Sequence, residues 1–189
     1  MKRILIVLIT MAFIIPAWGQ EEGELSRREK RKLERQERKA RMEEEREKTA
    51  KLVEYMAENQ QFVLEANMLF DKYGQSFPVT PNINFVAVDS LEGVIQIGSN
   101  SYIGSNGVGG VTLEGSVGKY EFKENEKKGY YSISYSLTTS VGTYDIFMTM
   151  NKNGNADATV RGNFGGSIRY SGNVEHPSVS RVYKGMSLY

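Results

Sequence analysis

The feature that most constrains the fold is an alternation of apolar and polar residues that begins at Gln60 and continues through most of the remaining chain. It is clearest where Tyr131, Ile133, Tyr135 and Leu137 are separated by serines. Successive side chains of a β-strand point to opposite faces of a sheet, so a period of two predicts strands with one buried face. We expect about eight or nine such strands, which follow one another closely.

The connections between these strands are short and rich in turn-forming residues. Asn153 and Gly154 form an Asn-Gly step, which tolerates the positive φ of a tight hairpin. Two further turns end at Gly129 and Gly142. Because such connections leave no room for a crossover helix, neighbouring strands must be antiparallel. The sequence therefore predicts a mainly β domain over residues 60–177, built as an antiparallel barrel or sandwich and preceded by a charged helix.

Residues 1–19 have the pattern of a signal peptide. Two basic residues precede the apolar run 4–15, and Ala17 and Gly19 are the small residues that a signal peptidase requires. The run is shorter than the ~20 residues that span a bilayer, so we expect cleavage after Gly19; the alternative is an uncleaved membrane anchor. After cleavage no integral membrane span remains. Because the chain contains no cysteine to carry lipid, we expect a periplasmic or secreted protein that is not a lipoprotein.

Residues 20–59 form a segment that is predicted to be helical. Its stretch 24–48 contains eleven basic and eight acidic residues, no glycine and no proline. A sustained apolar seam is missing, so a coiled coil is not predicted. Over residues 49–59 apolar residues recur at helical spacing, and this part is expected to pack on the β domain. The charged stretch is either a solvated helix or tether, or an arm that docks on an acidic surface or a partner helix.

The composition argues against a metal, a cofactor and a nucleic acid partner. Without cysteine and with His176 as the only histidine, the chain has too few nitrogen and sulfur ligands for zinc. Four aspartates that could ligate calcium are scattered among different strands and turns: Asp71, Asp89, Asp145 and Asp157. The net charge of +1 gives no reason to expect a nucleic acid partner.

The sequence also contains no arrangement that is typical of an enzyme. The glycine-rich residues 101–110 resemble a phosphate-binding loop, but they include no basic residue and lead into a strand rather than a helix. We interpret them as a connection between antiparallel strands. Paired carboxylates could hydrolyse a glycosidic bond, but the candidates alternate with core residues and are expected to face solvent. These candidates are Glu65, Glu114, Glu121, Asp145 and Asp157. We therefore predict that the protein is not an enzyme.

Several stretches are similar to a known bacterial family. They are PNINFVAV (81–88), GVTLEG (110–115), GYY (129–131), YDI (144–146), NGNA (153–156) and IRYSG (168–172). Between about Gln60 and Val174 the chain resembles the family catalogued as domain of unknown function 4251. The resemblance implies an exported protein of Bacteroidetes-type bacteria with no assigned activity, and it offers no catalytic residues to transfer. The tail 178–189 departs from the family pattern, and its role is open.

Binding is the function that we expect for the β domain. Eight phenylalanines and eleven tyrosines provide surface for a small apolar, glycan or peptide ligand, although Tyr131, Tyr135 and Tyr144 follow the buried alternation and are predicted to be structural. The candidate contacts are aromatic residues in glycine-rich loops and the asparagines near them: Tyr102, Asn106, Asn163 and Phe164. The alternative is a cell-envelope structural or interaction protein that docks a partner with its charged helix. The partner is thus a small ligand or an envelope protein.

Overall fold

The structure, a computed structural model, describes residues 26–101, 106–162 and 165–187. In these residues a long helix, α1 (Arg27–Glu58), is followed by strands and a short 3-10 helix, η1 (Pro81–Ile83). The strands are β1 (Gln61–Phe70), β2 (Ser76–Pro78), β3 (Phe85–Asp89), β4 (Glu92–Ile97), β5 (Val111–Asn125), β6 (Tyr130–Thr139), β7 (Gly142–Asn151), β8 (Asn155–Gly162) and β9 (Ser167–Glu175). The prediction of a mainly β chain that follows a helix is confirmed.

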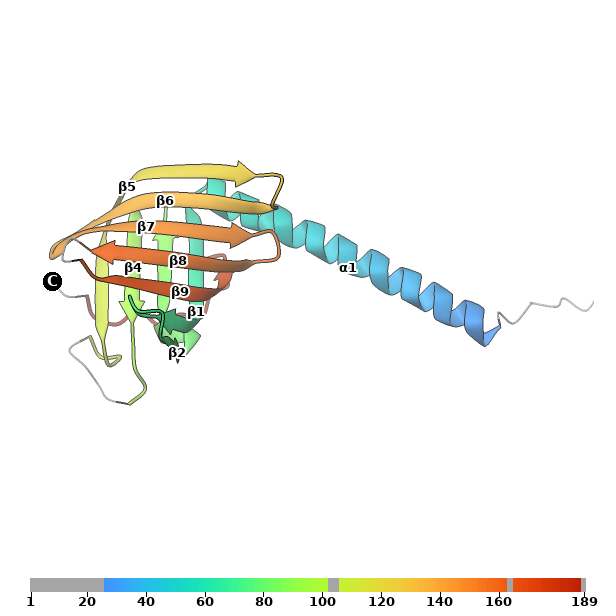
Figure 1. Ribbon diagram of the computed structural model, residues 1–189, viewed down its shortest axis with the longest axis horizontal. Helices are drawn as coiled ribbons and strands as arrows, with labels where there is room; N and C mark the ends of the chain where they lie inside the picture. The colour runs from blue at the N-terminus through green and yellow to red at the C-terminus, as the bar shows by residue number, and fades with distance from the viewer. Residues whose placement is uncertain (1–25, 102–105, 163–164, 188–189) are drawn as a thin grey trace, which may run out of the picture. The chain divides into compact units, whose positions relative to one another are not determined.

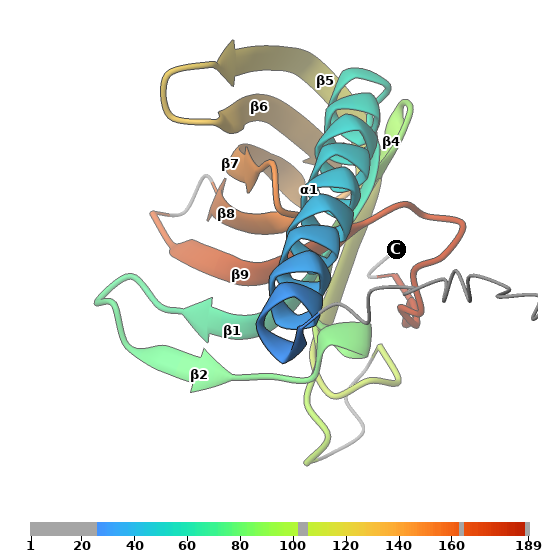
Figure 2. The ribbon, with the colours of Figure 1, turned by 90° about the vertical axis from the view of Figure 1, so that its right-hand side faces the viewer.

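The strands form one antiparallel sheet that closes on itself (Figure 1). One edge of β1 pairs with β3, and its other edge pairs with β9 from Val63 opposite Glu175 to Phe70 opposite Arg169. Eight strands, β1 and β3 to β9, therefore form a closed barrel. The additional strand β2 pairs with Met68, Leu69 and Phe70 and lies beside β1 (Figure 2). Of the two predicted architectures, the barrel is the one that forms.

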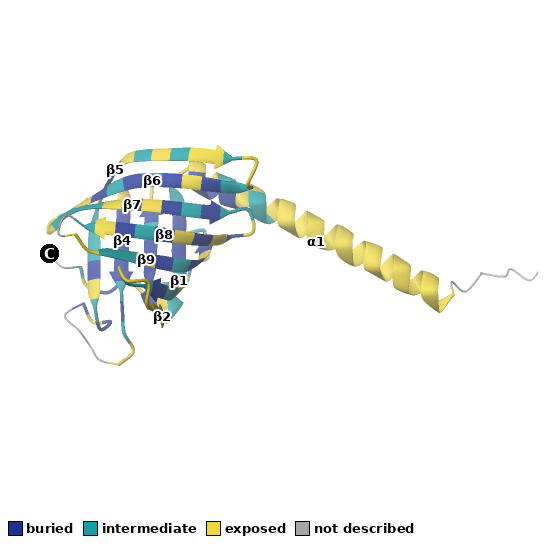
Figure 3. Cartoon of the chain, in the orientation of Figure 1, coloured by how far each residue is buried: buried dark blue, intermediate teal, exposed yellow. Residues whose placement is uncertain are grey.

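The predicted alternation and turns explain most of the strands. In β6 the side chains of Tyr131, Ile133, Tyr135 and Leu137 are buried. The same alternation of buried and exposed residues runs along the neighbouring strands of the barrel wall (Figure 3). At the hairpin between β7 and β8, Gly154 has a φ of 89°, as the Asn-Gly step predicts. Buried faces and tight hairpins together thus produce the sequential antiparallel pairing.

The alternation breaks at one place in β1, where the sequence predicts the wrong buried residues. The pattern places Met68 and Phe70 in the core with Phe62, Leu64 and Ala66, but the structure leaves both only half-buried and buries Leu69 instead. The register with β9 shifts between Ala66 and Met68. One additional residue in a strand moves all later side chains to the opposite face of the sheet.

Helix α1 is divided between two compact units, residues 1–40 and 41–189. In the first unit the helix begins with a reciprocal cap, in which the Ser26 amide donates to the Glu29 carboxylate at 2.9 Å and the Glu29 amide donates to the Ser26 hydroxyl at 3.4 Å. The other described residues of that unit are exposed. No described helix combines the length and the apolar character that a bilayer-crossing segment needs.

The last part of α1, in the second unit, contributes to the barrel interior. Val53, Met56 and Ala57 are buried in the same core cluster as Phe62 and Tyr131. The Tyr120 hydroxyl of β5 donates to the carbonyl oxygen of Ala57 at 2.5 Å. We call this end of the barrel, where β1 begins, the helix end, and the end where β1 finishes the open end. Leu52 belongs to the stretch 49–59 that was expected to pack on the β domain, but its side chain is 46% exposed.

Replacing Met56 with alanine tests how much α1 stabilises the barrel. The side chain is 1% exposed, so Met56→Ala should lower the free energy of unfolding by about 2–5 kcal/mol through lost burial and the space left behind. Met42 in the same helix is 44% exposed, and Met42→Ala should change that free energy by less than about 0.5 kcal/mol. Urea unfolding followed by circular dichroism measures both. Equal losses in the two variants would contradict the packing of α1 on the core.

Candidate functional site

The structure describes one of the four predicted contact residues, Asn106. Tyr102, Asn163 and Phe164 lie outside the described residues. Asn106 is 1% exposed and comes shortly before β5. Its side-chain oxygen accepts hydrogen bonds from the amides of Val108, at 3.1 Å, and Gly110, at 3.0 Å. Asn106 therefore shapes the end of the connection between β4 and β5, and its contact with a ligand stays a prediction.

Asn106 belongs to a buried polar network on the outer face of the barrel, with Gln96 at its centre. The Asn106 amide nitrogen donates to the Thr112 hydroxyl at 3.1 Å, and that hydroxyl donates to the Gln96 side-chain oxygen at 2.9 Å. The Gln96 side-chain nitrogen donates to the carbonyl oxygens of Ile83, at 3.1 Å, and Tyr183, at 2.8 Å. A polar group this deeply buried needs such partners, because an unpaired one costs about 1–3 kcal/mol.

The chain segment that covers this network is the tail whose role the sequence leaves open. We call residues 180–186 the C-terminal strap. Its Ser180 hydroxyl donates to Glu65 at 2.7 Å, and its Gly185 amide donates to Gln96 at 2.8 Å. Glu65, Phe85, Gln96 and Thr112 are successive register partners across β1, β3, β4 and β5. The strap therefore crosses these strands and buries polar and apolar groups on the outer face.

A cavity of about 380 Å³ occupies the open end of the barrel. Its wall is mostly apolar and is formed by Ile95, Ile97, Leu113, Val160, Ile168 and Tyr170. Polar groups line it through Asp71, Lys72, Tyr144 and Ser167. Gly162 leaves room for the Tyr144 ring, since a Cβ at this glycine would lie 3.1 Å from Cε1 of Tyr144. Two described residues of the wall, Gly162 and Gly166, flank the predicted contacts Asn163 and Phe164.

Most of the cavity residues were predicted only as core. Alternation identifies the inward face of Ile95, Ile97 and Val160 but not whether the space beside them is filled. Tyr144 was predicted to be structural, and the structure places it at the cavity. Nearby glycines at residues 162, 165 and 166 were the available signal, because they supply no side chain to fill the end of the barrel.

The environment of three tyrosines at the barrel interior favours the neutral hydroxyl. Burial raises the pKa of Tyr120, Tyr135 and Tyr170 far above the ordinary range. Tyr170 donates to the Gln96 carbonyl oxygen at 3.4 Å. The Tyr135 hydroxyl is buried without a hydrogen-bond partner among the described residues. None of the three is thus activated as a base or nucleophile, since both roles need an accessible deprotonated form.

The carboxylates that were considered for hydrolysis do not converge. Asp145, Asp157 and Glu121 are exposed, and Glu114 forms an ion pair with Lys184 of the strap at 2.6 Å. Glu65 accepts the hydrogen bond from the Ser180 hydroxyl of the strap. Within the described ranges, no three histidine or acidic side chains come close enough to hold a metal ion.

His176 is placed at the start of the tail and has a local partner. Its Nδ1 lies 2.8 Å from the Ser178 hydroxyl and accepts the Ser178 amide at 3.2 Å. Accepting a main-chain amide assigns Nδ1 as the unprotonated nitrogen in this pair. Within the described residues no hydrogen bond joins Nε2 to a carboxylate, which a catalytic triad would require. The pair is therefore a turn-stabilising contact.

The exposed first part of α1 carries basic side chains on one face. Arg28, Arg31, Lys32 and Arg35 line a shallow groove, in agreement with their spacing of three and four residues. Across residues 26–40 none of these four has an ion pair. This arrangement would suit an acidic partner, and a docking role for the helix stays a prediction.

Comparison with known proteins identifies the chain's relatives. The model of a family described as domain of unknown function (DUF4251) matches residues 43–174. A crystal structure at 1.95 Å resolution of a DUF4251 family protein from Bacteroides eggerthii DSM 20697 is similar, with 33% sequence identity and a TM-score of 0.59. The similarity covers 70% of this chain and 90% of that chain. Curated proteins give no match. The family match ends at Val174 and does not include the strap.

A substitution in the strap tests its attachment. A Cβ at Gly185 would lie 2.4 Å from the Asn106 carbonyl oxygen and 2.9 Å from Cγ2 of Val108, so Gly185→Ala must displace the strap. We expect a loss of about 1–3 kcal/mol in the free energy of unfolding and faster tryptic cleavage after Arg181 and Lys184. Gly166→Ala is the matched control, because its Cβ would meet no atom within 4 Å. Equal cleavage of the two variants would show that the strap is not held in this way.

Proposed function

The chain belongs to the DUF4251 family, whose function is unknown, and we propose from the geometry of its barrel that it binds a small, mainly apolar ligand without catalysing a reaction. The observation that supports this proposal is the cavity of about 380 Å³ at the open end. Ligand sites in proteins measure about 300–1,000 Å³ and are found preferentially in places such as the mouths of β-barrels. The cavity lies within this range.

The character of the wall favours an apolar ligand over a glycan or an extended peptide. A glycan needs several hydrogen-bonding groups along its length, whereas Ile95, Ile97 and Leu113 offer only hydrocarbon. A peptide backbone would leave amides and carbonyls unpaired against the same surface. Binding an alkyl or aromatic group there removes apolar area from water at ~25 cal/mol per Å². We therefore restrict the ligand to one whose buried part is hydrocarbon.

We propose no catalysis because of the positions of the reactive side chains. Asp71 and Lys72, which follow β1, are the charged residues among those that line the cavity. His176 lies outside the residues that line it. In the described part of the chain, no hydrogen bond joins the Ser167 or Tyr144 hydroxyl of the cavity to a base, which covalent catalysis needs.

Filling the cavity tests the proposed function. Leu113→Trp places a larger side chain in the wall and should weaken binding of the neutral fluorescent probe N-phenylnaphthylamine about tenfold or more, equivalent to ~1.4 kcal/mol. Fluorescence titration, with excitation beyond the absorption of tryptophan, measures the dissociation constant. Leu91→Trp is the matched control, because Leu91 is 73% exposed in the turn between β3 and β4.

Two results would contradict the proposal. One is the absence of saturable binding of the probe to the native protein, with a panel of fatty acids, sterols and aromatic hydrocarbons also giving no thermal stabilisation. The other is unchanged affinity in a folded Leu113→Trp variant, which would place the probe elsewhere. Equal weakening in Leu91→Trp would likewise show that the effect does not come from the cavity.

We also propose that the protein acts outside the cytoplasm, since residues 1–19 have the pattern of a cleaved signal peptide. Expression in a Gram-negative host should give a periplasmic or secreted product whose first residue is Gln20, measured by mass spectrometry of the intact protein. Ala17→Leu places a large residue where the peptidase requires a small one, so this variant should retain Met1. Recovery of the unaltered chain at full length in the membrane fraction would instead support a retained anchor.

A further inference from the structure

The opening of the cavity has polar groups on one side, in the turn that connects β1 to β2. Asp71 and Lys72 follow the last residue of β1, and both line the cavity. The apolar wall continues inward to Tyr170, which is fully buried. A ligand that occupies the hydrocarbon wall would therefore leave its outer end beside this turn.

The Asp71 carboxylate is engaged within the turn. One of its oxygens accepts the amide of Tyr73 at 2.8 Å and the amide of Gln75 at 2.9 Å. The Asp71 amide in turn donates to the Gln75 carbonyl oxygen at 3.0 Å. Two amide donors on one oxygen offset part of its negative charge, and the closed turn fixes the position of the next residue, Lys72.

Lys72 carries a charge that the described residues do not neutralise. Its side chain is exposed, and it forms no ion pair with any carboxylate in the described ranges. The partner that the structure gives it is the ring of Tyr73, whose centroid lies 4.9 Å from Nζ. A cation–π contact at an exposed site leaves the ammonium free to donate to an anion.

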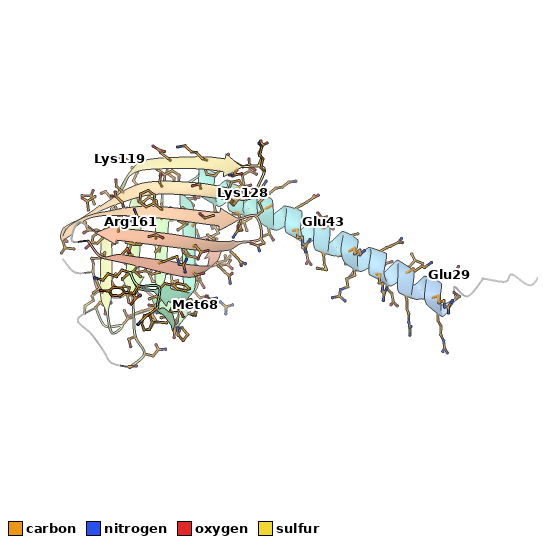
Figure 4. All side chains as sticks on the ribbon, in the orientation of Figure 1. Glu29, Glu43, Met68, Lys119, Lys128 and Arg161 are labelled. Carbon is orange, nitrogen blue, oxygen red and sulfur yellow. The ribbon has the colours of Figure 1, made fainter. Side chains whose placement is uncertain are left out.

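Two arginines add positive charge around the same end of the barrel. Arg161 in β8 lies 5.3 Å from the ring centroid of Phe147, and Arg169 in β9 lies 4.0 Å from that of Phe70. Arg161 lies on the barrel wall in Figure 4, away from Lys128 at the helix end. Their acidic neighbours are Asp145, the register partner of Arg161, and Asp157, which lies two residues before Thr159, the register partner of Arg169. Neither arginine forms an ion pair within the described chain. Cations therefore outnumber unengaged anions near the opening.

We propose that the ligand is an anionic amphiphile, with its hydrocarbon part in the cavity and its anionic head held by Lys72. This inference rests on the proposed function and adds the chemical class of the ligand. The apolar wall takes the chain, and the ammonium at the opening pairs with the head while the head stays partly hydrated. The partial hydration matters because, in a fully buried ion pair, the free energy of removing both charges from water offsets their attraction. Lys72 thus determines specificity, whereas the wall supplies most of the affinity.

Three ligands with the same chain and different heads test this inference: decanoate, decanol and decyltrimethylammonium, each below its micelle concentration. Isothermal titration calorimetry should show that decanoate binds about three- to tenfold more tightly than decanol. This gain in affinity lies between the gain from an exposed ion pair and the gain from a charged hydrogen bond. Decyltrimethylammonium should bind most weakly. High salt should reduce the preference for decanoate, because the head and Lys72 remain accessible to solvent.

Lys72→Gln should remove the preference, so that decanoate and decanol bind with similar affinity. Lys128→Gln removes the same charge from the turn between β5 and β6, at the helix end, and should retain the preference. If decanol binds but decanoate is not preferred, or if the preference survives in Lys72→Gln, the inference is wrong and the proposed function stands. If neither decanol nor decanoate binds, the proposed function fails with it.

Discussion

The pairing of β1 with β9 is the interaction on which the rest of the structure depends. It joins the first and last strands of the barrel over the length of β1, from Val63 opposite Glu175 to Phe70 opposite Arg169. Without it the same strands would form an open sheet with two long unpaired edges and an interior exposed to water. Closure satisfies both edges and creates an enclosed space whose filling is then decided by the inward side chains.

The sequence predicts the interactions between residues that are close along the chain better than those between residues that are far apart. Alternation in β6 and the turn at Gly154 are local, and both were predicted correctly. Closure between β1 and β9 is not local, so the pattern alone left a barrel and a sandwich as alternatives. The bulge after Ala66 has no signature in composition. Burial of the polar Gln96 on the outer face depends on the strap, which lies about ninety residues further along the chain.

The candidate site was the least predictable part of the structure. It forms because, within the described chain, one end of the barrel lacks the large side chains and the packed helix that fill the other end. Large residues meet at the helix end, where Phe62 and Tyr131 pack with side chains of α1. The open end has no helix of that kind among the described residues, and its strand ends include Gly162 and Gly166. Sequence gives the volume of each inward residue but not the number of elements that contribute to each layer.

Gln96 in the barrel wall connects the outer strap to the inner cavity. The Gln96 side chain binds the strap through Tyr183 and Gly185 on the outer face, while its carbonyl oxygen accepts the hydroxyl of Tyr170, a cavity residue. Strand β4 is thus held from both sides where Ile95 and Ile97 line the cavity. A wall fixed in this way needs little ordering when a ligand enters, so more of the free energy of burying hydrocarbon becomes binding affinity.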